Sequence, residues 1–199
     1  MIKLIIFDLG GVVVNYYEEQ YFDFLSKKTG IDAKKIKTAF SDVIKQQEAG
    51  KITLAEMEKI VIKRLNINHN GLEWSEAFKR IAKPNKKTIT TVRQLKKNYK
   101  VVLLTNISYS RYISATQFIF DKTLFKKRFV SCYLKMRKPD KKIYLYVLKT
   151  MKVKPSEAIF IDNLKENIMG AEKVGIRGLL FTSNEKLIAD LKKIQVRFK

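Results

Sequence analysis

The sequence predicts an α/β fold in which an open parallel sheet carries a small helical segment inserted after its first strand. Short apolar, β-branched runs alternate along the chain with helical patterns, as they do in parallel sheets with right-handed crossovers. Between the first of these runs and the others, residues 15 to about 85 read as helices throughout. The 199 residues suffice for one core, or for one core and a smaller appended unit.

Four apolar runs have the continuous Ile, Val, Leu and Phe content of strands that are buried on both faces. They are "KLIIFD" (3–8), "KVVLLTN" (100–106), "EAIFIDN" (157–163) and "RGLLFTS" (177–183). A weaker fifth candidate is "RFVSCYL" (128–134). Helical patterns between these runs are "TITTVRQLKKNY" (88–99), "KKIYLYVLKTM" (141–151) and "KENIMGAEKVG" (165–175). The alternation predicts a sheet of at least four parallel strands.

The helical segment shows apolar residues at three- and four-residue spacing, the period of amphipathic helices. Its helical stretches are "EEQYFDFLSKKTG" (18–30), "DAKKIKTAFSDVIKQQEAG" (32–50), "TLAEMEKIVIKRLN" (53–66) and "LEWSEAFKRIA" (72–82). Gly30 and Gly50 follow expected helix ends, and Thr53 with Glu56 has the pattern of a capping box. We expect residues 15–85 to form a cap over the end of the first strand, and residues 1–14 and 86–199 to form the core.

The charge of the chain is strongly positive. It contains 41 Lys and Arg against 19 Asp and Glu, which gives a net charge of +22. A field of this size attracts anions such as phosphate esters or nucleic acid. The lysines are spread along the whole chain and form no dense block. The charge therefore predicts a Lys-rich surface, with nonspecific nucleic-acid binding as a secondary expectation.

Several classes of protein are excluded by composition. No stretch is long and apolar enough to span a bilayer, so we expect no membrane association. Cys132 is the single cysteine, which rules out an internal disulfide and fits a reducing, cytoplasmic location. His69 is the single histidine. It excludes a zinc site built on two histidines, and we expect no Ser-His-Asp triad.

Polar residues stand at the carboxyl ends of the expected strands, where ligands bind in open α/β sheets. Asp8 ends the first run. The other residues are Thr105 with Asn106, Asp162 with Asn163, and Lys138, which lies in "MRKPD" just before a helix. We expect these side chains to meet at one edge of the sheet and to form a single site.

The chemistry of this set suits a phosphate group. Two carboxylates that lie close together repel unless a cation such as Mg²⁺ is bound between them. Asp8 is placed to attack phosphorus and form an aspartyl-phosphate that water hydrolyses. The Thr105 hydroxyl and the Lys138 ammonium can bind the non-bridging oxygens. Gly10 and Gly11 can leave backbone N–H groups free for a close approach to the phosphate.

Four motifs in order resemble those of the haloacid dehalogenase (HAD) superfamily across nearly the whole chain. They are "FDLGGVVV", "LLTN", "RKPD" and "FIDNLKEN". "EAGKITLAEM" also resembles a stretch common in the helical caps of that superfamily. Within it, the chain is similar to sugar-phosphate phosphatases of the α-glucose-1-phosphatase type. The resemblance implies a Rossmann-like core and Mg²⁺-dependent hydrolysis of a small phosphomonoester, a phosphorylated metabolite such as a sugar phosphate.

The resemblance also implies roles for individual residues. Asp8 is the nucleophile. The Mg²⁺ ligands are the Asp8 carboxylate, the backbone carbonyl of Gly10, and the motif-four pair Asp162 and Asn163. The phosphate is bound by Thr105 and Lys138 with Asn106 beside them.

Two positions depart from the usual pattern of the superfamily. Gly10 occupies the position of an Asp that acts as general acid and base, a function typically worth about 10²–10⁴ in rate. Asn163 replaces the usual Asp ligand and brings no charge to the metal. Tyr16, Tyr17 or Glu18 could donate the proton instead, and the sequence does not distinguish between them. The alternative function is therefore a weak or inactive HAD-like protein that binds a phosphorylated ligand or partner.

Overall fold

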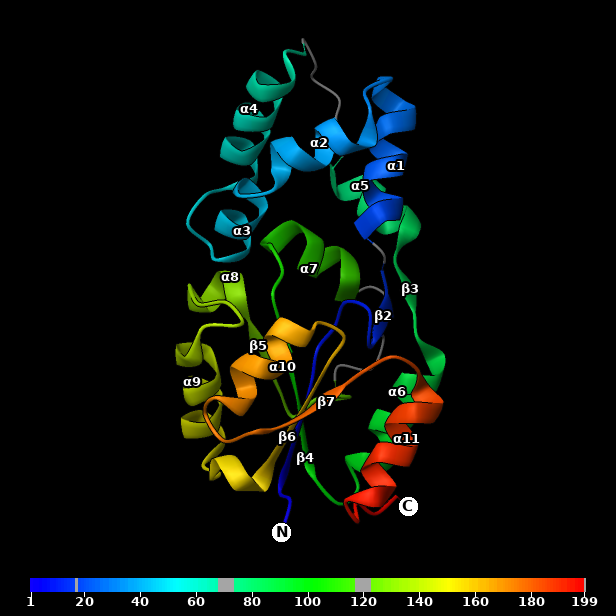
Figure 1. Ribbon diagram of the computed structural model, residues 1–199, viewed down its shortest axis with the longest axis vertical. Coiled ribbons are helices and arrows are strands. Elements are labelled where there is room, and N and C mark those ends of the chain that lie inside the picture. Colours follow the sequence, from blue (N-terminus) through cyan, green and yellow to red (C-terminus); the bar gives the residue numbers. More distant parts are fainter. Residues whose placement is uncertain (17, 68–73, 117–122, 199) are drawn as a thin grey trace.

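The computed structural model describes residues 1–16, 18–67, 74–116 and 123–198, and it shows a sheet with flanking helices and a helical group beyond one end of that sheet (Figure 1). The sheet has five strands in the order β5-β4-β1-β6-β7, and all neighbours are parallel. The strands are β1 (Leu4–Phe7), β4 (Lys100–Thr105), β5 (Lys127–Val130), β6 (Ala158–Asp162) and β7 (Arg177–Leu180). The predicted α/β class with a parallel sheet is confirmed.

Helices cover both faces of the sheet because successive strand residues point to opposite sides. In β1, Ile5 and Phe7 belong to one hydrophobic core and Leu4 and Ile6 to the other. The first core is closed by α6 (Lys86–Leu95) and α11 (Asn184–Lys193), and the second by α9 (Lys141–Met151) and α10 (Lys165–Glu172). Every residue of β1 is fully buried, so this central strand is a rigid support for whatever follows it.

Two strand predictions need correction. In "RFVSCYL" the strand ends at Val130, and Ser131–Leu134 form the short helix α8. The run 177–183 forms a strand only to Leu180, and this strand is not buried, because β7 lies at the edge of the sheet and Leu180 is exposed. A short 3-10 helix, Pro155–Glu157, precedes β6.

The helical group packs around a hydrophobic core of its own that includes Tyr21, Phe22 and Phe40. Its members are α1 (Glu18–Thr29), α2 (Ala33–Phe40), α3 (Val43–Glu48), α4 (Leu54–Leu65) and α5 (Trp74–Ile81). The capping box of Thr53 and Glu56 is present at the start of α4. The stretch 32–50 forms two helices instead of one continuous helix, because the chain turns at residues 41–42. We call α1–α5 the helical segment.

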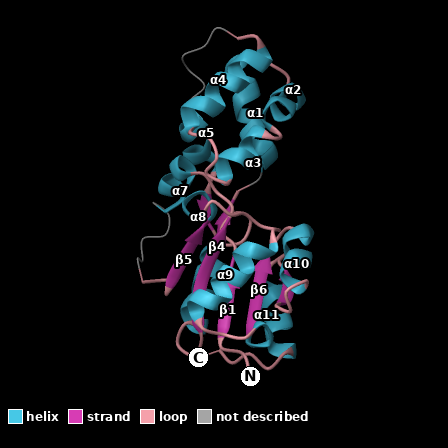
Figure 2. Cartoon of the chain, turned by 90° about the vertical axis from the view of Figure 1, so that its left-hand side faces the viewer, coloured by secondary structure: helices cyan, strands magenta, loops and turns pink. Residues whose placement is uncertain are grey.

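The helical segment is joined to the sheet by two adjacent chain crossings. β2 (Val14–Asn15) and β3 (Lys83–Pro84) pair with each other in an antiparallel two-stranded sheet. The segment also contacts the core where α3 meets α8 and where α5 meets α7 (Tyr109–Thr116). Figure 2 shows the carboxyl ends of the strands directed toward this segment. The domain limits at residues 15 and 85 stay a prediction.

Two further expectations from the sequence concern His69 and membrane-spanning helices. His69 lies outside the described residues. Within the described ranges, no helix combines the length and the apolar content that a membrane crossing requires.

Candidate active site

Three neighbouring strands bring the predicted site residues to the side of the sheet where the carboxyl ends of its strands lie. Asp8 directly follows β1, which lies between β4 and β6. Thr105 is the last residue of β4 and Asp162 the last residue of β6. The Asp8 N–H donates to the carbonyl oxygen of Ile161 at 2.9 Å, so the backbone stays in register beyond the end of β1. All three side chains are buried, and Asp8 and Thr105 line the same cavity.

Lys138 completes this group from the loop between α8 and α9. Its Nζ lies 2.7 Å from Asp8 Oδ1 and 2.5 Å from Asp162 Oδ2. The Lys138 side chain is 1% exposed and that of Asp162 is 0% exposed. Asn106 fixes the Lys138 backbone, since its Nδ2 donates to the Lys138 carbonyl at 2.9 Å and its Oδ1 accepts from the Lys138 N–H at 2.8 Å. Asn106 therefore positions the lysine, and its predicted contact with phosphate stays a prediction.

The electrostatics of the group follow from two carboxylates that share one ammonium. Burial raises the pKa of Asp8 to about 7, the neighbouring Asp162 adds to the rise, and Lys138 opposes it. Burial acts to lower the pKa of Lys138, but Asp162 and Asp8 together raise it above its ordinary value. Lys138 is therefore a permanent cation, and the group carries one negative charge in excess when both acids are ionised.

Asp162 is held in place by the start of α10. The Leu164 N–H donates to Asp162 Oδ1 at 2.8 Å, and Asn167 Nδ2 donates to both carboxylate oxygens at 3.2 and 3.0 Å. The other amide atom of this side chain, Asn167 Oδ1, is buried without a hydrogen-bond partner among the described residues. Asn167 lies inside the quoted fourth motif, but nothing in its spacing distinguished it from a residue at the start of a helix.

The two glycines after Asp8 have different environments. Gly11 adopts a φ of 76°, and its N–H donates to the Val14 carbonyl at 2.7 Å. The expectation that this N–H is free for phosphate is therefore wrong, because it closes a turn. A Cβ at Gly11 would lie 2.4 Å from Asn163 Nδ2, whereas a Cβ at Gly10 would have no heavy atom within 4 Å. Asn163 itself is exposed and lies against this turn.

A cavity of about 460 Å³ contains Asp8 and extends to the helical segment. Of the predicted residues, it is lined by Asp8, Gly10, Thr105, Asn106, Lys138 and Asn163. Tyr16 and Glu18 also line it, while Tyr17 lies outside the described residues. Burial raises the pKa of Tyr16 to about 12, so its phenol stays protonated.

The sequence interpretation missed several charged residues of this cavity, among them Glu48, Arg111 and Arg137. Arg137 Nη2 lies 3.2 Å from Glu48 Oε2. Burial raises the pKa of Glu48, and Arg137 opposes the rise. The backbone of Glu48 is also fixed, since Ser131 Oγ donates to its carbonyl at 2.5 Å. These residues come from the helical segment and from two core elements, so only the packed fold brings them together.

Comparisons with known proteins show the family of this chain. A family model described as haloacid dehalogenase-like hydrolase matches residues 2–175. This chain belongs to that family.

Three relatives of this HAD chain are phosphatases or HAD enzymes. A sesquiterpene phosphatase from Aspergillus oryzae is 27% identical and the match covers 96% of each chain. A D-ribitol-5-phosphate phosphatase from Bacteroides thetaiotaomicron is 24% identical, over 88% of this chain and 89% of the relative. The crystal structure of a HAD family enzyme from the same bacterium, in complex with magnesium and inorganic phosphate, superposes with a TM-score of 0.80. It is 25% identical and covers 92% of this chain and 95% of that one.

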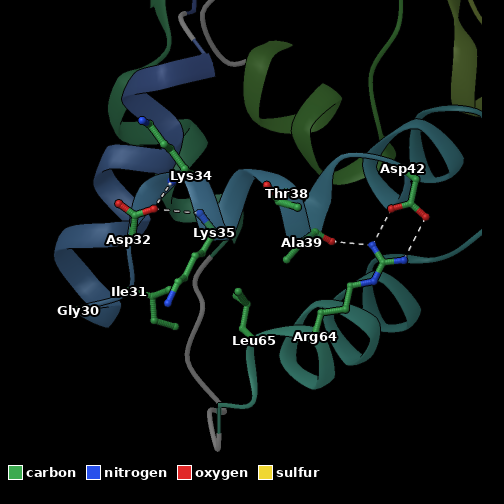
Figure 3. A pocket seen from close by; sticks show the side chains of 10 residues that line it. All are labelled: Gly30, Ile31, Asp32, Lys34, Lys35, Thr38, Ala39, Asp42, Arg64 and Leu65. Atoms are coloured by element: carbon green, nitrogen blue, oxygen red, sulfur yellow. Dashed lines mark hydrogen bonds and ion pairs between the residues drawn. The ribbon is translucent and has the colours of Figure 1, made fainter.

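The HAD chain has a larger cavity that lies away from Asp8, within the helical segment (Figure 3). Its volume is about 1150 Å³, and its lining includes Asp32, Asp42 and Arg64. Arg64 donates to Asp42 from two nitrogens, at 2.6 and 3.1 Å, and to the Ala39 carbonyl at 2.8 Å. None of the site residues predicted from the sequence lines this cavity.

Proposed function

We propose that this HAD hydrolase is a Mg²⁺-dependent phosphatase that hydrolyses a small phosphomonoester through an aspartyl-phosphate on Asp8. The observation that carries the proposal is the buried group formed by Asp8, Lys138 and Asp162, of which Asp8 and Lys138 line the cavity. Perturbed, buried charges in a cavity at the carboxyl ends of parallel strands are typical of an active site. The similarity to two phosphatases supports the class of reaction.

The residues at the floor of the cavity fit a magnesium ion. Mg²⁺ binds through one or two carboxylates and completes its shell with water and substrate phosphate, so it needs no cage of protein acids. In keeping with this, no cluster of three or more His, Cys, Asp or Glu side chains suited to a metal occurs in the described ranges. Asp8 and Asp162 supply the carboxylates and the excess negative charge, and Asn167 Oδ1 is an unused buried oxygen beside them. We propose Asp8, the Gly10 carbonyl and Asp162 as ligands, with Asn163 or Asn167 adding an amide oxygen.

The chemistry of each residue follows from this placement. Bound Mg²⁺ would neutralise phosphate charge and hold the phosphoryl group in line with its attacker. Asp8 attacks phosphorus, the bond from phosphorus to the leaving oxygen breaks, and water then attacks the aspartyl-phosphate to release inorganic phosphate and regenerate Asp8. Lys138 holds Asp8 in place and offers N–H donors to the phosphoryl oxygens, as the Thr105 hydroxyl does. Because Gly10 offers no proton, good leaving groups that depart as stable anions should react fastest.

We further propose that the helical segment acts as a cap over this site. It contributes Glu18 and Glu48 to the lining of the cavity, and Tyr16 lies in the connection that leads into it. A cap of this kind excludes water from the reacting groups and selects the leaving group.

The proposal is tested by phosphate release from p-nitrophenyl phosphate, with and without Mg²⁺. We expect activity that requires Mg²⁺ and that falls to the level of buffer alone in Asp8→Asn. Asp42→Asn in the helical segment is the matched control and should keep the activity of the wild type, since Asp42 lines the other cavity. Turnover by Asp8→Asn at the rate of the wild type would show that the nucleophile is assigned wrongly.

Gly10 supports one alternative, a protein that binds a phosphorylated ligand with little or no turnover. Glycine has no side chain that could protonate the leaving oxygen, and the position where a Cβ at residue 10 would lie is open space. Thermal stabilisation by phosphate and Mg²⁺ without phosphate release would favour this alternative. Nonspecific nucleic-acid binding stays a separate prediction from the charge, and retention on DNA that disappears at modest ionic strength would test it.

A further inference from the structure

A second charged group in the cavity lies where the cavity meets the helical segment. Arg111 of α7 and Arg137 of the loop before Lys138 both line the cavity that contains Asp8. The guanidinium of Arg111 lies over the ring of Tyr21 of α1, with 4.5 Å between its Cζ and the ring centroid. Arg137 pairs with Glu48 of α3. Both guanidinium groups therefore contact the helical segment, unlike Lys138, which contacts the strand ends.

Both arginines retain buried donors that bind nothing in the described structure. Arg111 is 7% exposed, and its Nη2 has no hydrogen-bond partner among the described residues. The same is true of the Nε of Arg137. A guanidinium has donors and no acceptor, and a buried donor left unsatisfied is costly. Such donors in a ligand cavity indicate that the ligand supplies acceptor oxygens.

The contacts already made by the two side chains leave this role open. The contact of the Arg111 guanidinium with the Tyr21 ring leaves its Nη2 without a hydrogen-bond partner among the described residues. Glu48 occupies one nitrogen of Arg137. Arg111 is buried, whereas the side chain of Arg137 is 26% exposed. The other charged lining residues at this end of the cavity are Glu18, Glu19, Lys45 and Glu48. A charged guanidinium makes its strong hydrogen bonds to ionised acceptors, so the unpartnered donors favour an anion over a neutral polyol.

The scissile phosphate does not account for these donors, because in the proposed function it is bound at the strand ends by Asp8, Thr105 and Lys138. A cavity of about 460 Å³ is large enough to hold a small molecule that reaches from the strand ends to the helical segment. We propose that Arg111 and Arg137 bind a second anionic group of the substrate. The preferred substrates are then phosphomonoesters whose leaving group carries a carboxylate or a second phosphate. This inference rests on the proposed function.

Matched pairs of substrates test the inference on the wild-type protein. One pair is 2-phosphoglycolate and ethyl phosphate, which differ by a carboxylate in place of a methyl group. A second pair is propane-1,3-diyl bisphosphate and propyl phosphate, which tests a phosphate as the second anion. We expect kcat/KM to be about tenfold or more higher for at least one of the anionic members, because hydrogen bonds to charged groups are the strong ones.

Variants then connect this preference to the two arginines. Arg111→Met and Arg137→Met should each reduce the preference about tenfold or more, mainly through the anionic substrate. Arg111→Lys keeps the charge but loses the planar fork, and it serves where Arg111→Met does not fold. Arg93→Met is the matched control, since Arg93 is an exposed residue of α6 outside this cavity, and its preference should equal that of the wild type.

Failure of this inference can be told apart from failure of the proposed function. Suppose that the wild-type protein hydrolyses p-nitrophenyl phosphate and that this activity depends on Asp8. If its kcat/KM is then equal for both members of each pair, or higher for the alkyl phosphates, the second-anion site alone is overturned. An unchanged preference in both arginine variants also overturns it. If no substrate is turned over, thermal shifts test the site. It is supported if 2-phosphoglycolate raises Tm more than ethyl phosphate does and if this difference is lost in Arg111→Met or Arg111→Lys. Equal shifts for the two compounds overturn it.

Discussion

The cavity of the helical segment and the cavity at the strand ends differ in how deeply their charges are buried. In the helical segment, the side chains of Arg64 and Asp42 are 40% and 56% exposed beside a cavity of about 1150 Å³ (Figure 3). At the strand ends, Lys138 and Asp162 are 1% and 0% exposed beside a cavity of about 460 Å³. The charges beside the smaller cavity are the more deeply buried, so their desolvation costs more free energy.

Under the proposed function, burial is a better guide to the reactive site than volume. Exposed ion pairs are screened by water and contribute little to stability. Buried ones carry a desolvation cost that their mutual attraction hardly repays. A chain that keeps two acids and a lysine buried at one point therefore keeps a destabilising feature, which is expected where chemistry needs it.

The largest expected effect is that of Lys138→Met. It would leave Asp8 and Asp162 buried without their cation, at a cost of about 3–5 kcal/mol in the free energy of unfolding. The pKa of Asp8 is already raised above its unfolded value, and this change raises it further. The folded state then binds more protons than the unfolded state, so stability should fall as the pH rises from about 5 to about 8. Urea unfolding at the two pH values measures both effects.

Lys87→Met is the control for this experiment. Lys87 lies 2.7 Å from Glu185, the distance that also separates Lys138 from Asp8, but its side chain is 74% exposed. Its loss should change stability little and leave phosphate release intact. Equal losses in the two variants would contradict the claim that burial decides the difference.

A smaller effect is expected at the turn that follows Asp8. Gly11→Ala places a side chain at a φ of 76° and within 2.4 Å of Asn163 Nδ2. Left-handed backbone at a non-glycine residue costs about 1–3 kcal/mol. Gly10→Ala is the matched control, because the added methyl meets no heavy atom within 4 Å. A midpoint of urea unfolding that is lower in Gly11→Ala than in Gly10→Ala would agree with this, and equal midpoints would not.

The smallest effect concerns the exposed pair of the helical segment. The hydrogen bond from Arg64 lowers the pKa of Asp42 to about 2. The stabilisation that this gives is present above the unfolded pKa of 3.8 and is lost as the pH falls toward about 2. Asp42→Asn should therefore flatten the decline of Tm in acid slightly. Asp23 is an exposed acid on α1, and Asp23→Asn should follow the wild type. Equal flattening in both variants would contradict the role of Arg64.

The sequence was sufficient for the floor of the site but not for its walls. Continuous β-branched runs identified the central strands, and the parallel arrangement then placed Asp8, Thr105 and Asp162 at one edge. These positions depend on local pattern and on one topological rule. Glu48, Arg111 and Arg137 were missed because they lie far apart in the sequence, and only the packing of the helical segment against α7 and α8 brings them together.

The other errors also have local causes. Residues 131–134 follow a strand without a break in hydrophobicity, so a strand and the short helix α8 could not be distinguished. The run at 177–183 has the composition of a buried strand, yet its place at the sheet edge is set by strand order. The N–H of Gly11 is used within its own turn, which the presence of two glycines alone does not reveal.

The pairing of β2 with β3 has a consequence for how this protein can diverge. The chain leaves the sheet and returns to it through two strands that are hydrogen-bonded to each other. Insertions, deletions or wholesale exchange between these strands leave the spacing of the sheet residues untouched. Under the proposed function, new leaving-group preferences can thus evolve, or be engineered by grafting, while the residues at the strand ends stay unaltered.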